Sequence, residues 1–97
     1  MSAYIIADIN VTNAEGYGPY REAAQKSIAA HGGRYIARGG AVQALEGSWN
    51  PARLVIIEFP SVDAARTWYH SPEYQAALKI RHAHSSGHVV LTEGLPS

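Results

Sequence analysis

The sequence contains no cysteine, and only one methionine and one phenylalanine among its 97 residues. Without cysteine the chain has no disulfide framework, no thiolate nucleophile and no cysteine metal site. It also lacks an apolar run long enough to cross a bilayer, and Met1 is followed by an apolar segment without a basic region. These absences predict a cytoplasmic protein with no signal peptide and no transmembrane helix.

Charge is scarce as well. Charged residues make up 16% of the chain, and eight lysines and arginines balance eight aspartates and glutamates. A neutral chain offers no basic field for nucleic acid or an anionic membrane, so we expect neither partner. The charged share is below the roughly 25% usual in soluble domains, and a domain this small is marginally stable alone. We therefore expect one domain over residues 1–97, partly covered by a second copy.

The apolar pattern predicts the element order β-α-β-β-α-β. Four strands are expected, and the third is a continuous apolar run typical of a central strand. The second helical region divides in two at Ser71-Pro72, an N-cap followed by a proline at the first helical position. The predicted strands span residues 3–11, 34–38, 52–59 and 88–93, and the predicted helices span residues 12–31, 62–70 and 72–84.

Short polar and glycine-rich segments predict where these elements begin and end. Thr12 with Glu15 resembles a capping box for the first helix, although Pro19 offers a second starting point. Gly32-Gly33 is expected to end that helix, and Gly39-Gly40 to introduce a bulge or bend. Pro60-Ser61 caps the next helix, and residues 85–87 are expected to break the last one.

This order predicts an α+β, ferredoxin-like domain with an antiparallel sheet and both helical regions on one face. The other face would then carry Tyr4, Ile6, Leu54 and Ile56. Bare apolar faces of this kind mark interaction surfaces. Packing two sheets face to face would cover both, so we expect a homodimer.

Four separated motifs carry a family resemblance over nearly the whole chain. The sequence resembles the domain of unknown function 1330 family, which implies a dimeric α/β barrel but no particular activity or cofactor. The sequence departs from that pattern before the last strand, where relatives often carry an acid and this chain has His84 and His88. The motifs are residues 31–40 (HGGRYIARGG), 45–47 (LEG), 57–61 (IEFPS) and 68–75 (WYHSPEYQ).

Two polar groups are candidates for catalysis. Asp8 and Glu58 share the bare face of neighbouring strands, and Arg38 is predicted to join them there, where a carboxylate can serve general acid–base chemistry. The alternative is a structural ion pair, or charges at strand ends that reach water. Tyr20 and His31 lie on the sheet-facing side of the first helix and form a possible donor and base. The alternative is ordinary packing, with His31 at the helix C-terminus.

Aromatic and histidine residues near the second helical region suggest further roles. Trp68 and Tyr69 are candidates for the walls of a ligand pocket, with core or dimer packing as the alternative. His82, His84 and His88 have no neighbouring acid, so no metal site is expected, and their roles stay open. The glycine pairs lack the context of a phosphate loop.

Two functional hypotheses follow from these residues. The first is a cofactor-independent enzyme acting on a small organic substrate, in which Arg38 orients the substrate and a carboxylate or His31 moves a proton. The alternative is a non-catalytic dimeric module that binds a ligand or is purely structural. Neither requires a cofactor, and the substrate and reaction type stay open.

Overall fold

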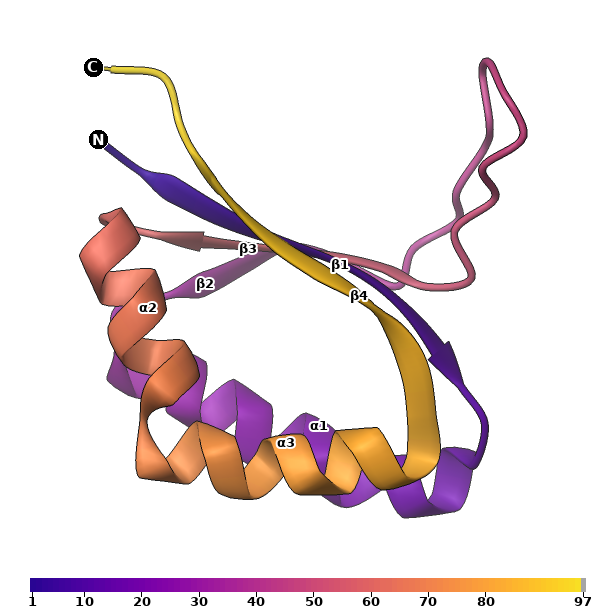
Figure 1. The fold of residues 1–97 in the computed structure, drawn as a ribbon, viewed down its shortest axis with the longest axis horizontal. Coiled ribbons are helices and arrows are strands. Elements are labelled where there is room, and N and C mark those ends of the chain that lie inside the picture. The colour runs from indigo at the N-terminus through magenta and orange to yellow at the C-terminus, as the bar shows by residue number, and fades with distance from the viewer. Residues whose placement is uncertain (97) are drawn as a thin grey trace.

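The computed structural model describes residues 1–96 and has a single layer of helices packed on one sheet (Figure 1). The described residues form seven elements in the predicted order. They are β1 (Ala3–Val11), α1 (Ala14–Ala30), β2 (Arg34–Arg38), β3 (Leu54–Phe59), α2 (Val62–His70), α3 (Pro72–His84) and β4 (Ser85–Glu93).

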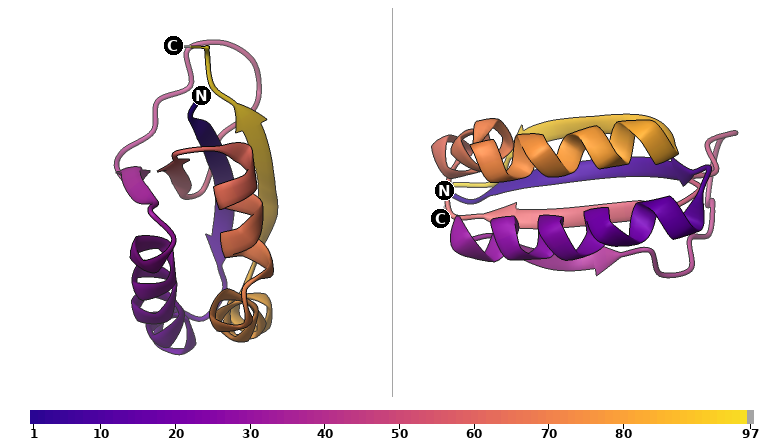
Figure 2. Two further views of the ribbon diagram at one scale, coloured as in Figure 1. Left: turned by 90° about the vertical axis from the view of Figure 1, so that its left-hand side faces the viewer. Right: turned by 90° about the horizontal axis from the view of Figure 1, so that it is seen from below.

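The sheet has the strand order β2-β3-β1-β4, and all three pairings are antiparallel. Helices α1 and α3 lie side by side across one face, and α2 covers the remaining part of that face (Figure 2). We call this the covered face and the opposite one the bare face. The predicted α+β, ferredoxin-like architecture with an antiparallel sheet is confirmed.

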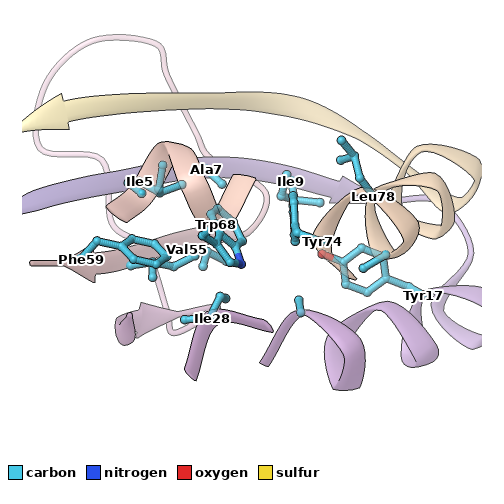
Figure 3. Packing of buried hydrophobic residues seen from close by; sticks show 14 residues of the cluster. Ile5, Ala7, Ile9, Tyr17, Ile28, Val55, Phe59, Trp68, Tyr74 and Leu78 are labelled. Carbon is cyan, nitrogen blue, oxygen red and sulfur yellow. The ribbon is translucent and has the colours of Figure 1, made fainter. Parts of the chain in front are cut away.

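Alternating side chains on the central strands build the core on the covered face. Ile5 and Ile9 of β1 and Val55 and Ile57 of β3 are buried, while their sequence neighbours point to the bare face. Trp68 from α2 joins them as the largest buried side chain. Figure 3 shows these side chains from the strands and the helices meeting in one layer.

Side-chain caps explain where the helices begin. Ser61 and Ser71 accept hydrogen bonds from the backbone N–H groups of Ala64 and Tyr74, as their positions predicted. The cap of α1 was predicted wrongly: Asn13, not Thr12, accepts from the Gly16 N–H at 3.1 Å. Pro19 lies inside α1, so the helix does not begin there.

The bulge in β2 is not at the glycine pair. The register with β3 shifts between Tyr35 and Ala37, so Ile36 is the extra residue. Gly39 instead adopts φ +72°, a conformation that L side chains rarely take. Residues 39–53 then form an irregular segment, and β3 begins at residue 54 rather than 52.

The junction between α3 and β4 also differs from the prediction. Helix α3 ends at His84, as predicted, but β4 begins at residue 85 rather than 88, because Ser85 pairs with Val11 and Gly87 pairs with Ile9. A Cβ at Gly87 would collide with the Asp8 carbonyl oxygen, so glycine here serves close strand approach rather than a turn.

The bare face is apolar, as predicted. Ile6, Leu54 and Ile56 are half-buried there, and Val90 of β4 is 57% exposed. No described element covers this face. Among the described residues, none of the helices is long and apolar enough to cross a membrane.

Candidate functional site: a tyrosine–arginine cavity

A cavity of about 360 Å³ lies between the covered face of the sheet and the helices. We call it the tyrosine–arginine cavity, after the two residue types that supply its polar groups. Its lining residues are Ile5, Ala7, Ile9, Tyr17, Tyr20, Arg21, Gln25, Tyr35, Arg38, Arg53, Val55, Ile57, Trp68, Tyr74, Arg81 and Val89.

The strands give the cavity an apolar floor. Ile5, Ala7 and Ile9 alternate along β1, and Val55 and Ile57 lie beside them on β3. The polar and aromatic residues of the walls come from the edge strand β2, from the helices and, for Arg53, from the end of the 39–53 segment. An apolar body with a few convergent polar groups is the usual composition of a small-molecule site.

Two tyrosine hydroxyls meet at the helix side of the cavity. The Oη atoms of Tyr20 on α1 and Tyr74 on α3 are 2.8 Å apart. Burial raises the pKa of Tyr20 far above its ordinary value, and the neighbouring Tyr74 raises it further. Burial also raises the pKa of Tyr74. Both phenols therefore stay protonated, and since only one proton is needed between them, the other is free to donate.

Trp68 supplies an aromatic wall whose N–H group is already used. Its Nε1 donates to Ser27 Oγ at 3.0 Å, and Ser27 Oγ donates in turn to the Ala24 carbonyl oxygen at 2.9 Å. The ring packs on Tyr74 with centroids 4.1 Å apart. These contacts hold the indole ring in place and leave it only an apolar surface to offer a ligand.

Arg81 lies deepest among the charged residues of the cavity. It is only 5% exposed, and its Nε has no hydrogen-bond partner within residues 1–96. The Nε of the half-buried Arg53 is likewise unpartnered within that range. The Arg81 charge lowers the pKa values of Tyr20 and Tyr74, although burial outweighs it at both. Buried polar groups are normally paired, so two unpaired guanidinium nitrogens mark this place as unusual.

Two exposed arginines stand where the cavity meets solvent. The Arg38 guanidinium lies 4.6 Å from the centroid of the Tyr35 ring, and that of Arg21 lies 5.4 Å from the centroid of Tyr17. Arg38 Nη1 also donates to Gln25 Oε1 at 3.3 Å. This bond links β2 to α1 across the opening.

The predicted convergence of Asp8, Glu58 and Arg38 is wrong. Asp8 pairs with Leu54 and Glu58 pairs with Tyr4, so the two acids lie four residues apart along β1, about 13 Å. Arg38 is not on their face at all. The extra residue in the β2 bulge reverses the alternation, which places Arg38 opposite Val55 on the covered face.

Each of the two acids has partners of its own on the bare face. Asp8 accepts from Trp49 Nε1 at 2.9 Å and from the Ala52 N–H at 3.0 Å, and the Trp49 bond holds the pKa of Asp8 below its ordinary value. Glu58 accepts from Arg34 Nε at 2.7 Å, which lowers the pKa of Glu58. The Glu58 contact fits the structural ion pair that was the alternative, whereas Asp8 is held by neutral hydrogen-bond donors.

The remaining predicted residues divide between inside and outside the cavity. Tyr20 and Trp68 line it, as Arg38 does. His31 lies outside, at the end of α1, where its Nδ1 is 2.9 Å from the Ser27 carbonyl oxygen and its Nε2 is 3.7 Å from Glu73. Tyr69 lines a separate, more open hollow of about 340 Å³ near α2 and β4.

The histidines near the end of α3 gather no further ligands. His84 is half-buried against Gly16 of α1, and His82 and His88 are exposed. Residues 1–96 contain no cluster of three or more histidines or acids positioned to hold a metal ion.

Sequence reasoning missed most of the charged lining. Arg81 carried a usable signal, since it is a charged residue on the apolar stripe of α3 that also holds Tyr74, Ala77 and Leu78. Arg53 carried one as well, because in the predicted strand 52–59 it alternates with Leu54 and so falls on the covered face. Arg21 carried none, because an exposed helical residue looks alike whether or not it borders a cavity.

The strand order, the one-sided helix layer and the cavity between sheet and helices define a ferredoxin-like α+β domain with a candidate small-molecule site. The family model described as domain of unknown function (DUF1330) matches residues 2–95, and the chain belongs to that family. Sequence comparison with curated proteins found no match.

Solved structures share the fold at low sequence identity. A protein of unknown function from Rhodopseudomonas palustris is 20% identical, with a TM-score of 0.80 over 99% of this chain and 84% of that one. SnoaB from Streptomyces nogalater, described as a cofactor-independent oxygenase, is 13% identical, with a TM-score of 0.67 over 99% and 95%. A protein from Bacteroides fragilis, described as dimeric with a ferredoxin-like fold, is 17% identical, with a TM-score of 0.55 over 96% of each chain.

Proposed function

We propose that this protein binds a small organic molecule in the tyrosine–arginine cavity of each protomer of a homodimer. The observation that carries the proposal is the cavity itself, whose volume of about 360 Å³ lies within the range of roughly 300–1,000 Å³ for ligand pockets. Its apolar floor and inward polar groups match that kind of site. The packing of Trp68 on Ser27 and Tyr74 supports a largely preformed wall.

The proposed dimer is inferred from the apolar residues of the bare face. Ile6, Leu54, Ile56 and Val90 together form an apolar surface that no element of the same chain covers. A second copy placed sheet to sheet would bury it. The Bacteroides fragilis protein that shares the fold is described as dimeric, which supports the same assembly here.

Native mass spectrometry of the untagged protein tests both parts of the proposal. We expect a dimer whose mass exceeds that of two chains, with the excess released on denaturation. Ala7→Leu fills the cavity floor, so we expect this variant to lose the excess mass and stay dimeric. Ala29→Leu, at an exposed position on α1, is the matched control and should keep both.

Contrary outcomes are equally concrete. An excess that persists unchanged in Ala7→Leu would place the ligand elsewhere. A wild-type dimer that binds no member of a panel of aromatic and aliphatic fragments by NMR contradicts the binding function. Val90→Lys should yield monomers while Ala29→Lys does not, and a dimeric Val90→Lys protein would remove the bare face from the interface.

A second candidate, a cofactor-independent enzyme, is favoured by the hydroxyl pair of Tyr20 and Tyr74 beside Arg81. Preorganised donors in a water-poor site stabilise an oxyanion that develops on a bound substrate. The fold carries cofactor-independent oxygenation in SnoaB, which supports this candidate by analogy of fold alone. Arg38 keeps its predicted orienting role, whereas Asp8, Glu58 and His31 lie outside the cavity and have no part in it.

Conversion of a molecule recovered from the cavity separates the two candidates. An enzyme turns the released molecule over on incubation with fresh protein, and Tyr20→Phe slows that turnover while leaving binding in place. A binding module returns the molecule unchanged in every variant.

A further inference from the structure

The charges around the cavity are all of one sign. Four arginines line it, which is half of the chain's eight lysines and arginines, and within residues 1–96 no acid or histidine lines it. The four are Arg21, Arg38, Arg53 and Arg81. The chain as a whole is neutral, so this gathering of charge is local and does not follow from composition.

None of the four is neutralised by an acid among the described residues. The one arginine ion pair within residues 1–96 joins Arg34 to Glu58 on the bare face. A guanidinium cannot lose its proton to escape burial. A buried charge is costly unless it is paired, and the cost is greatest for the least exposed of the four, Arg81.

We infer that the cavity takes a small planar organic carboxylate, with Arg81 as the buried anchor of the carboxylate group. The inference rests on the proposed function, since it assigns a ligand class to the same cavity. A carboxylate supplies the counter-charge that the Arg81 guanidinium lacks among the described residues. The free hydroxyl proton of the Tyr20–Tyr74 pair provides a second donor beside it.

The shape and composition of the walls define the rest of the ligand. Aromatic rings from Tyr17, Tyr20, Tyr35, Trp68 and Tyr74 surround the cavity, and flat rings pack best against such surfaces. The floor is aliphatic, which suits an apolar body and not a bare inorganic anion. A volume near the lower end of the usual pocket range favours a ligand with about one ring.

The exposed arginines give the entrance its own function. Arg21 and Arg38 are held over tyrosine rings, so their charges stay close to the opening. Positive charge at the mouth attracts an anion, while the deeper Arg53 and Arg81 meet it inside. The arrangement of the four arginines therefore favours both the approach and the retention of an anion.

The test uses benzoate as the anionic probe, benzamide as its neutral isostere and inorganic phosphate as a simple anion. We expect benzoate to shift the Arg81 Nε–H resonance in an NMR titration of the full-length protein, with an affinity that falls as salt is raised. Benzamide should bind at least about tenfold more weakly, because it lacks the charge. Phosphate should not displace benzoate at equal concentration.

Arg81→Met removes the charge and keeps most of the side-chain volume. We expect benzoate affinity to fall at least about tenfold, while the unliganded variant denatures at the same or a higher urea concentration than the wild type. An arginine with a purely structural role would instead make its variant less stable. Lys79→Met, exposed on the same helix, is the control and should change neither property.

The outcomes separate this inference from the proposed function. Equal binding of benzamide and benzoate in the cavity would overturn the carboxylate assignment and leave the binding function standing. Displacement of benzoate by phosphate at equal concentration would overturn the planar carboxylate as the ligand class and indicate a simple anion instead. No binding of any probe, and no copurified molecule in the native mass spectrum, would overturn both. An Arg81→Met protein that binds benzoate as tightly as the wild type would remove Arg81 as the anchor.

Discussion

The two faces of the sheet handle charge in opposite ways. On the bare face, Glu58 is matched by Arg34, and Asp8 is held by the Trp49 indole and a backbone N–H. On the covered face, Arg53 and Arg81 each keep an unpartnered Nε within residues 1–96. The acids of the bare face therefore have partners among the described residues, and these two guanidinium nitrogens of the covered face do not. An unpaired charge is more costly when it is buried, so the unpaired and buried Arg81 guanidinium points to a partner that the described residues do not supply.

The two tryptophans allow the sharpest test of this contrast. Trp68 on the covered face is 1% exposed, whereas Trp49, which binds Asp8, is 62% exposed. Trp68→Ala should lower the free energy of unfolding by about 3–5 kcal/mol. Trp49→Ala removes mainly one hydrogen bond, so about 1 kcal/mol is expected. Urea denaturation followed by far-UV circular dichroism, at one fixed protein concentration, measures both. Equal losses would contradict the assignment of the core to the covered face.

The adjacent glycines at the end of β2 give a test of intermediate size. Gly39 has φ +72°, and a Cβ there would collide with the Arg53 guanidinium. Gly39→Ala should cost about 1–2 kcal/mol for the left-handed backbone and displace Arg53 from the cavity. Gly40 has open space around it, so Gly40→Ala should stay within about 0.5 kcal/mol. The same denaturation experiment checks both, and a costly Gly40→Ala would show that the segment is constrained in another way.

Acid titration of Glu58 on the bare face should give the smallest effect. The pKa of Glu58 is lowered in the folded protein from 4.5, chiefly by the hydrogen bond from Arg34. The unfolded chain therefore binds a proton at higher pH, so the stabilisation is complete above about pH 4.5 and is lost as pH falls below it. Arginines on the covered face do not titrate in this range.

Glu58→Gln isolates that contribution. The difference in stability between the wild type and Glu58→Gln should shrink as pH falls from 6 to 3 in urea denaturation experiments. Glu22→Gln, exposed on α1, is the control for the loss of one charge. A difference that grows on acidification would have the wrong sign for a lowered pKa.

Periodicity and capping residues were enough to predict the order of the elements. Alternating side chains marked β1, and Ser71-Pro72 marked the boundary between α2 and α3, because these signals act between residues close in sequence. The register of β2 was not predictable in this way. The bulge falls at Ile36, which has no glycine or other marker, and one extra residue was enough to send Arg38 to the opposite face.

The site was predictable only in part for the same reason. Tyr20 and Trp68 were found because helical spacing turns them toward the sheet. Arg81 was visible on an apolar stripe, but whether an acid meets it depends on residues far away in the sequence. The absence of such an acid among the described residues became evident only in three dimensions.

The placement of the two indole rings also gives the protein a built-in optical reporter. Trp68 borders the cavity in an apolar setting, while Trp49 lies mostly exposed on the 39–53 segment. Their emission should therefore divide into a blue-shifted and a red-shifted component. In a Trp49→Phe background the remaining tryptophan fluorescence would come from a single ring on the cavity wall, so occupancy of that space is readable without any added label.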